Sequence, residues 1–157
     1  MLAVLNRETR LQVSGSTRLS MPKSREAYVD TSALIAFLDR SDTHHSLFAR
    51  LFAAPPKLYT SSLVLAEGHG WFLRRYDSSR ALTFLSFIET LTPLRILDVD
   101  EATLTRATIL LRQFQDQPLT LADAVGLALI QTRKTSLCWS TDRHLRLTGA
   151  ALAIDET

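Results

Sequence analysis

The sequence has few of the residues that build disulfide-stabilised, disordered or membrane-spanning proteins. It contains one cysteine, five glycines and five prolines among 157 residues. The single cysteine, Cys138, excludes an internal disulfide framework and favours a reduced, intracellular protein of the cytoplasm. No apolar run approaches the roughly 20 residues of a membrane-spanning helix, so we expect no membrane partner. What remains is a globular domain.

Neither sign of charge dominates the chain. The net charge is +2, with 22% charged and 46% hydrophobic residues. This balance is typical of a single globular domain of this length. A mild basic excess is compatible with nucleic acid as a partner but does not predict one by itself. The sequence also lacks a cluster of cysteine and histidine at zinc-site spacing, which excludes a zinc-finger type of protein.

Two regions differ in their patterning. Residues 1–25 are polar without a sustained period, and we predict that they form an N-terminal extension outside a single domain at 26–157. From residue 27 onward, short apolar runs alternate with helical patterns. Strands are predicted at 27–30, 57–60, 94–99, 136–141 and 151–154, and helices at 31–40, 43–54, 61–76, 77–91, 100–115 and 121–132. This alternation predicts an α/β fold with a central, mostly parallel sheet of about five strands, flanked by helices.

Acidic residues occur where strands of this sheet are predicted to end. Asp30 closes "YVD" and Asp142 closes "CWSTD". Glu67 lies in the helix after "KLYT", and Asp123 lies in the first turn of an otherwise apolar helix. Sites in open α/β sheets form outside the carboxyl ends of the strands, so these acids are expected to converge. Converging carboxylates repel one another, and a hard divalent cation such as Mg²⁺ or Mn²⁺ removes that repulsion.

Each acid also has a purely structural interpretation. Asp30 and Asp142 both stand where the N-cap of a helix or turn is expected. Asp123 follows Thr120 by three residues, the spacing at which the two share the capping of a helix start. Glu67 can be a solvated helical acid, although it shares a stripe with apolar neighbours. The sequence leaves both interpretations open.

Four segments, in their order and separation, resemble the PIN domain family and specifically its small VapC-type ribonuclease toxins. "YVDTSALIAFLDRSDTHH" resembles the opening strand, first acid and following helix of the family. "SSLVLAEG" and "LTLADAVGLAL" resemble the segments that carry the second and third acids. "STDRHL" resembles the closing motif, in which a serine or threonine precedes the last acid by two residues. The resemblance extends over about residues 27–154 and implies a single PIN-like domain.

This resemblance implies an activity and a set of site residues. It places Asp30, Glu67, Asp123 and Asp142 in a catalytic cluster that binds Mg²⁺ or Mn²⁺, with Ser140 as a hydroxyl that hydrogen-bonds near the first acid. Asp30 and Asp123 are the expected principal ligands, whereas Glu67 and Asp142 act through water or on a second ion. The implied reaction is endonucleolytic hydrolysis of RNA by metal-activated water. The implied partners are the RNA substrate, a cognate antitoxin protein and a second copy of the chain in a homodimer.

Two other functions are compatible with parts of the sequence. A catalytically silent PIN-like module would bind RNA or protein with the same fold, but the presence of all four acids argues against it. A phosphotransfer domain with an aspartate nucleophile usually carries a second aspartate two residues later, where this chain has Ser32. The number of metal ions and the identity of the target RNA stay undetermined by the sequence.

Further residues are predicted to support these roles. Basic residues can contact RNA phosphates, and the candidates are Arg74, Arg75, Arg80, Arg133, Lys134, Arg143 and Arg146. Among these we favour Arg143 and Arg146, because they lie close to Asp142 in the sequence. Gly68 and Gly70 in the helix of Glu67 predict a close approach by a neighbouring element.

Overall fold

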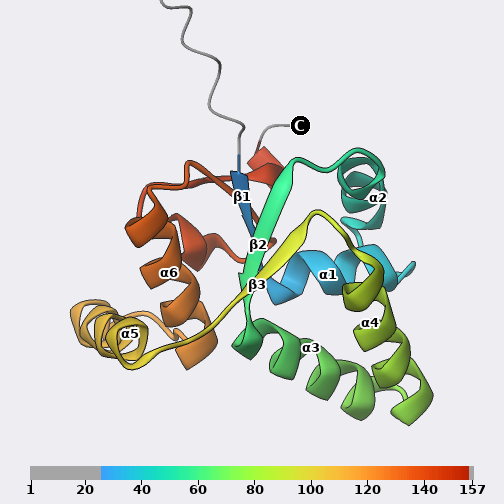
Figure 1. Cartoon of the computed structure of the whole chain (residues 1–157), viewed down its shortest axis with the longest axis horizontal. Helices are drawn as coiled ribbons and strands as arrows, with labels where there is room; N and C mark the ends of the chain where they lie inside the picture. Colours follow the sequence, from blue (N-terminus) through green and yellow to red (C-terminus); the bar gives the residue numbers. More distant parts are fainter. Residues whose placement is uncertain (1–25, 156–157) are drawn as a thin grey trace, which may run out of the picture.

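Five short parallel strands form the centre of the computed structural model, which describes residues 26–155 (Figure 1). The strands are β1 (Glu26–Val29), β2 (Lys57–Ser61), β3 (Leu94–Leu97), β4 (Leu137–Trp139) and β5 (Ala151–Leu152). Their order in the sheet is β3-β2-β1-β4-β5, and every neighbouring pair is parallel. The predicted α/β class is confirmed, and the sheet is wholly rather than mostly parallel. The predicted extension at residues 1–25 lies outside the described part of the chain.

Helices cover the sheet on two sides. The α-helices are α1 (Thr31–Leu38), α2 (His45–Ala53), α3 (Ser62–Arg75), α4 (Ser78–Thr90), α5 (Glu101–Gln113) and α6 (Leu121–Arg133). Two short 3₁₀ helices, η1 (Arg143–Arg146) and η2 (Ala153–Asp155), flank β5. In Figure 1, α5 and α6 lie on one side of the central strands, whereas α1, α2 and α4 lie on the other. Within residues 26–155, no helix has both the length and the hydrophobicity needed to cross a membrane.

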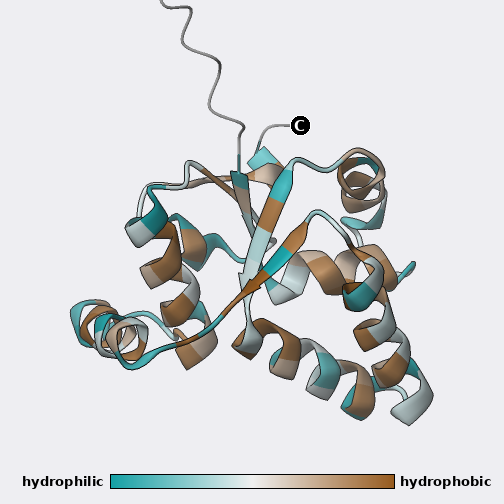
Figure 2. Cartoon of the chain, in the orientation of Figure 1, coloured by the Kyte–Doolittle hydropathy of each residue, from teal (hydrophilic) through white to brown (hydrophobic). Residues whose placement is uncertain are grey.

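The central strand and α6 explain the most apolar stretches of the sequence. Ala27, Tyr28 and Val29 of β1 are fully buried, as expected for a strand covered on both faces. The α6 helix is largely hydrophobic (Figure 2), and it is buried at Ala122 and from Ala124 through Ile130. A helix enclosed in this way can be apolar on every face. Asp123 therefore stands at the single acidic position of a buried helix, at its amino end.

Two glycines allow close approaches between elements. A Cβ atom added at Gly68 would lie 2.3 Å from the Phe84 ring, which brings α4 directly against the backbone of α3. A Cβ atom added at Gly126 would lie 2.6 Å from the hydroxyl of Tyr28, beneath α6. Gly70, by contrast, would meet first the guanidinium of Arg74, at 3.0 Å. The predicted close approach is therefore confirmed at Gly68 and wrong at Gly70.

The strands that precede Asp30 and Asp142 have their carboxyl ends on the same side of the sheet, because all neighbouring strands are parallel. β1 occupies the middle of the order, and β4 pairs directly with it. Four strands end earlier than predicted, whereas β2 continues one residue further, to Ser61. β4 stops at Trp139, and the next residue, Ser140, hydrogen-bonds to Ser32 at the start of α1. The carboxyl ends of these strands are therefore the expected location of the site.

Candidate active site

Asp30 is the buried centre of the site. It directly follows β1, is 5% exposed, and its backbone N–H donates to the carbonyl of Trp139 at 3.0 Å. Its Oδ2 accepts hydrogen bonds from the backbone N–H of Ser32 (3.1 Å), the Ser32 hydroxyl (2.6 Å) and the Ser140 hydroxyl (3.0 Å). Burial raises the pKa of Asp30 above its usual range, although these hydrogen bonds oppose the shift, and the charge of Asp123 raises the pKa further.

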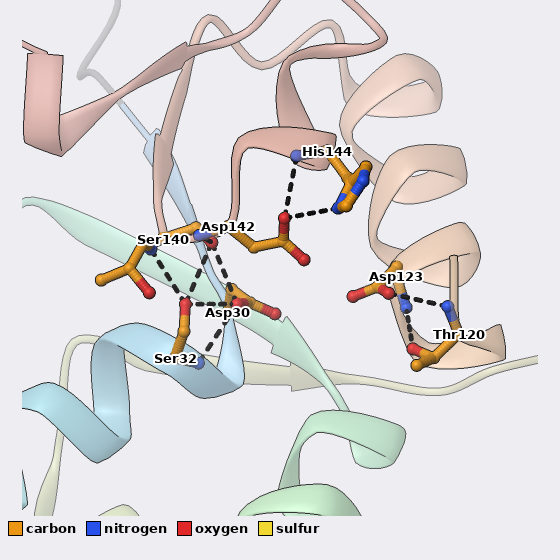
Figure 3. A network of polar contacts seen from close by, with 8 residues as sticks. Asp30, Ser32, Thr120, Asp123, Ser140, Asp142 and His144 are labelled. Atoms are coloured by element: carbon orange, nitrogen blue, oxygen red, sulfur yellow. Dashed lines mark hydrogen bonds and ion pairs between the residues drawn. The ribbon is translucent and has the colours of Figure 1, made fainter. Parts of the chain in front are cut away.

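Two serine hydroxyls connect the end of β4 to the start of α1 (Figure 3). Ser140 Oγ lies 3.0 Å from Ser32 Oγ and accepts the backbone N–H of Asp142 at 2.9 Å. Ser32 Oγ in turn accepts the backbone N–H of Thr141 at 2.9 Å. These bonds fix the loop that carries Asp142 to the loop that carries Asp30. Ser140 therefore occupies the place expected from the sequence, hydrogen-bonded to the first acid.

Asp142 caps η1 and faces the same space as Asp30. Its Oδ1 accepts the backbone N–H of His144 at 2.9 Å and lies 2.7 Å from His144 Nδ1. In Figure 3, the Asp142 carboxylate lies between those of Asp30 and Asp123, with one oxygen toward His144 and the other toward the shared space.

Asp123 begins α6 in a capping box with Thr120. The Thr120 backbone N–H donates to Asp123 Oδ2 at 2.8 Å, and the Asp123 backbone N–H donates to Thr120 Oγ1 at 3.1 Å. The carboxylate points from the helix start toward Asp30 and Asp142 (Figure 3). The helix N-terminus favours a negative charge at this position.

Glu67 reaches the site from α3 and is not a solvated surface acid. Its Oε2 accepts the hydroxyl of Thr31 at 2.9 Å, and its Oε1 accepts the hydroxyl of Thr120 at 3.4 Å. Burial raises the pKa of Glu67, and the charges of Asp123 and Asp30 raise it further. Glu67 thus hydrogen-bonds to α1 and to the loop before α6, and the charges of two other acids affect its pKa.

The capping interpretation is confirmed for the three aspartates, and each cap uses one carboxylate oxygen. The caps occupy Oδ2 of Asp30, Oδ2 of Asp123 and Oδ1 of Asp142. The second oxygen of each carboxylate has no hydrogen-bond partner among the described residues. We refer to Asp30, Glu67, Asp123 and Asp142 together as the acidic site. Its aspartates keep three free oxygens for a ligand.

The donors of the acidic site suit a hard divalent cation by their chemistry. They are carboxylates flanked by hydroxyls, without a thiolate, which is the ligand set that Mg²⁺ and Mn²⁺ prefer. A cation would also offset the repulsion among these carboxylates, which adds to the larger effect of burial in raising the pKa values of Asp30 and Glu67. Within residues 26–155, however, no three His, Cys, Asp or Glu side chains are gathered closely enough to form a ready-made metal site. The acidic site therefore matches a hard divalent cation in the type of its donor atoms and in its negative charge.

Several residues that hold the acids in place were not predicted as site residues. Thr31 and Ser32 bind Glu67 and Asp30, and Thr120 and His144 bind Asp123 and Asp142. The available signal was the hydroxyl residue beside each acid in "DTS", "LTLAD" and "STD". Apart from the pairing of Ser140 with the first acid, which the resemblance implied, the sequence does not identify which hydroxyl binds which carboxylate.

The candidate phosphate-binding arginines differ in their availability. Arg133 forms an ion pair with Glu26 at 2.7 Å and lies over the Tyr59 ring, 4.8 Å from its centroid. Arg146 is paired with Asp155. Arg143 is exposed and has no ion pair in the described part of the chain. Of the two arginines favoured by the sequence, Arg143 is thus the one whose charge is uncompensated.

Comparisons with known proteins agree with this architecture. The family model described as the PIN domain matches residues 27–150. No curated protein matches the chain. Among solved structures, VapC20 of Mycobacterium tuberculosis, described as a sarcin-ricin loop cleaving toxin, is similar with a TM-score of 0.73 at 23% identity, covering 80% of this chain and 96% of that one.

Two further solved structures show the same fold. A toxin–antitoxin complex from Klebsiella pneumoniae has a TM-score of 0.56 at 19% identity, covering 80% of this chain and 94% of that one. PAE2754 from Pyrobaculum aerophilum has a TM-score of 0.62 at 18% identity, covering 85% of this chain and 93% of that one. At these identities the structural similarity establishes a shared fold.

Proposed function

Because the chain belongs to the PIN domain family, we propose that it is a metal-dependent endoribonuclease that acts as the toxin of a toxin–antitoxin pair. One observation carries the proposal. Asp30, Asp123 and Asp142 each present one unbonded carboxylate oxygen to the same space, although each also caps a helix or turn. Helix capping alone does not require the three carboxylates to face one another.

In this proposal the chain's own residues bind the ion and hold the ligands. Asp30, Asp123 and Asp142 would hold Mg²⁺ or Mn²⁺ with their free oxygens, and Glu67 would supply a fourth carboxylate. Ser140 and Ser32 keep the buried Asp30 carboxylate in one orientation. The bound ion would lower the pKa of a water molecule and neutralise phosphate charge during hydrolysis of the RNA backbone. The expected products carry 5′-phosphate and 3′-hydroxyl ends.

The proposed partners follow from the family and from the structural neighbours. Solved neighbours include a toxin–antitoxin complex and VapBC2 from Rickettsia felis bound to a DNA fragment from their promoter. By analogy, a cognate antitoxin protein would bind this chain and block the acidic site, and the free toxin would form a homodimer. The substrate is RNA of unspecified class.

A catalytically silent PIN-like module is the second candidate. It is favoured by the lack of a ready-made metal site among residues 26–155. Such a module would bind RNA or protein without cleaving it. One experiment separates the two candidates.

The experiment measures cleavage of end-labelled RNA with excess chelator and with added Mg²⁺ or Mn²⁺. We expect cleavage only with the cation, and 5′-phosphate ends on the products. Asp30→Asn and Glu67→Gln should each lose most of the activity while remaining folded. Asp77→Asn and Glu89→Gln are the matched controls, since Asp77 caps α4 and Glu89 is exposed on the same helix.

The outcomes distinguish the candidates. Cleavage that persists in chelator, or equal cleavage by Asp30→Asn and wild-type protein, would show that the metal-dependent assignment is wrong or that a contaminating nuclease is present. Folded wild-type protein that binds RNA without cleaving it under any of these conditions would favour the silent module.

A further inference from the structure

His144 makes two hydrogen bonds to one oxygen of Asp142. Its backbone N–H donates to Asp142 Oδ1 at 2.9 Å, and its Nδ1 lies 2.7 Å from the same oxygen. Both side chains are about one-third exposed, at 31% and 32%. The backbone bond alone is sufficient to cap η1. The ring bond is additional and needs a separate explanation.

The ring bond fixes the direction of the second carboxylate oxygen. Asp142 Oδ2 has no hydrogen-bond partner among residues 26–155, and it points away from His144 toward Asp30 and Asp123 (Figure 3). Two donors on Oδ1 restrict rotation of the carboxylate about its terminal bond, which is otherwise broad. The orientation of Oδ2 therefore depends on the imidazole.

The other acids are held by different groups. Asp30 is held by serine hydroxyls and Glu67 by two threonine hydroxyls, whereas Asp123 is held by a backbone N–H. In Asp142 the corresponding group is a ring nitrogen, which acts as the donor because an ionised carboxylate can only accept. Nδ1 carries a proton in one neutral tautomer and in the charged form, so the contact does not depend on the charge of the ring.

From this geometry we propose that His144 is a positioning residue, which orients Asp142 toward the ion held by the acidic site. The assignment rests on the proposed function, because it concerns how well Asp142 serves as a ligand. Groups that hydrogen-bond to metal-binding side chains tune the affinity for the metal, and their loss typically costs roughly 10- to 100-fold in affinity or activity.

The test compares His144→Ala with His144→Asn. The asparagine amide can donate over a reach similar to that of Nδ1, whereas alanine cannot. Both variants keep the backbone bond that caps η1, so both should melt close to the wild-type temperature. We expect His144→Ala to weaken Mn²⁺ binding, measured by titration calorimetry, and to lower kcat, each roughly 10- to 100-fold. The KM for RNA should change little, and His144→Asn should recover most of both losses.

A second pair of variants tests whether His144 acts through Asp142. In an Asp142→Ala background, His144→Ala should cause no further loss of Mn²⁺ affinity, because the group it orients is absent. An additional loss of similar size in that background would overturn the assignment. So would a His144→Ala variant whose main defect is a raised KM, since that would make His144 a substrate contact.

The remaining outcomes separate this inference from the function on which it rests. If wild-type protein binds Mn²⁺ and cleaves RNA, and His144→Ala behaves identically, the positioning role alone is wrong. If wild-type protein neither binds Mn²⁺ nor cleaves RNA, the proposed function fails and the positioning role fails with it.

Discussion

Ser140 Oγ lies 3.0 Å from Asp30 Oδ2, although 110 residues separate the two in the sequence. Both residues are buried, at the ends of adjacent strands. The same hydroxyl accepts the backbone N–H of Asp142 at 2.9 Å. One buried serine thus determines the relative placement of two acids.

Ser140→Ala should reduce both stability and cleavage. The substitution leaves the Asp142 N–H without its acceptor and removes one donor from Asp30, which should cost about 1–3 kcal/mol. Denaturant unfolding and RNA cleavage measure the two effects. Thr83→Ala is the control, since that exposed hydroxyl donates only to the carbonyl of Ser79, and the change should stay within about 0.5 kcal/mol. Equal stability of the two variants would show that the Ser140 bonds contribute little.

Gly68→Ala and Gly70→Ala should have opposite effects, although they lie two residues apart in α3. A methyl group at Gly68 would lie 2.3 Å from the Phe84 ring, so α3 and α4 must separate, at a cost of about 1–3 kcal/mol. A methyl group at Gly70 meets the mobile end of Arg74, and the helix gains up to about 1 kcal/mol from the better helix former. Thermal melts of both variants and of the wild-type protein measure these changes in stability. Cleavage should fall only for Gly68→Ala, which displaces the neighbouring Glu67.

Arg143 and Arg133 should differ in their contribution to RNA binding. Arg143→Ala should weaken RNA binding and lower the slope of log affinity against log salt by about 1, as expected for the loss of one phosphate contact. Arg133→Ala should leave that slope unchanged and lower stability, because Arg133 pairs with Glu26 and covers the Tyr59 ring. Binding is measured in an Asp30→Asn background to prevent cleavage. A smaller salt slope for Arg133→Ala alone would reverse the assignment.

Cys138 should make stability fall at high pH. The thiol is fully buried, and burial raises its pKa well above the usual range, with further increases from the charges of Asp30 and Asp142. Above about pH 8.5 the unfolded thiol loses its proton while the native thiol keeps it. The free energy of unfolding therefore decreases as pH rises, by at most about 1.4 kcal/mol per pH unit. Denaturant melts between pH 8 and 10 should show that the free energy of unfolding decreases less with pH in Cys138→Ala than in the wild-type protein. An equal decrease in both proteins would show that Cys138 does not cause the pH dependence.

The fold could be predicted because its signals are local. Each strand and helix was recognisable from its own apolar pattern, and the parallel sheet follows from their alternation. Helix ends were less accurate: α1 ends at Leu38 because Asp39 adopts an extended conformation (φ −93°, ψ 102°), which the apolar pattern does not reveal.

The acidic site could be predicted only in part. Its three aspartates were identifiable because strand ends and helix starts can be predicted from the sequence, whereas Glu67 lies inside α3 and was assigned to the site by the resemblance. Their partners depend on long-range contacts such as that between Thr31 and Glu67, which are 36 residues apart. The choice between capping and clustering could not be made from the sequence, because each aspartate caps with one carboxylate oxygen and leaves the other without a hydrogen-bond partner among residues 26–155, and so available for a second role.

Asp123→Asn tests this dual role directly. As part of a capping box, the charge contributes roughly 0.3–1 kcal/mol at the start of α6. As a member of the acidic site, the same charge raises the pKa values of Asp30 and Glu67, so its removal relieves repulsion when no cation is present. The asparagine can still accept the Thr120 N–H, so the cap geometry persists.

We therefore expect Asp123→Asn to be inactive, at least as stable as wild type in chelator, and less stabilised by Mg²⁺. Added Mg²⁺ stabilises a protein more when it binds the folded state more tightly, and the variant would lack one of the proposed ligands. Denaturant melts of both proteins, with chelator and again with Mg²⁺, measure the two effects. Asp100→Asn is the control, because Asp100 caps α5 as an exposed residue outside the acidic site, so only the interaction of its charge with the helix N-terminus should be lost. If Asp123→Asn loses as much stability as Asp100→Asn in chelator and gains as much as wild type from Mg²⁺, Asp123 serves only the helix start.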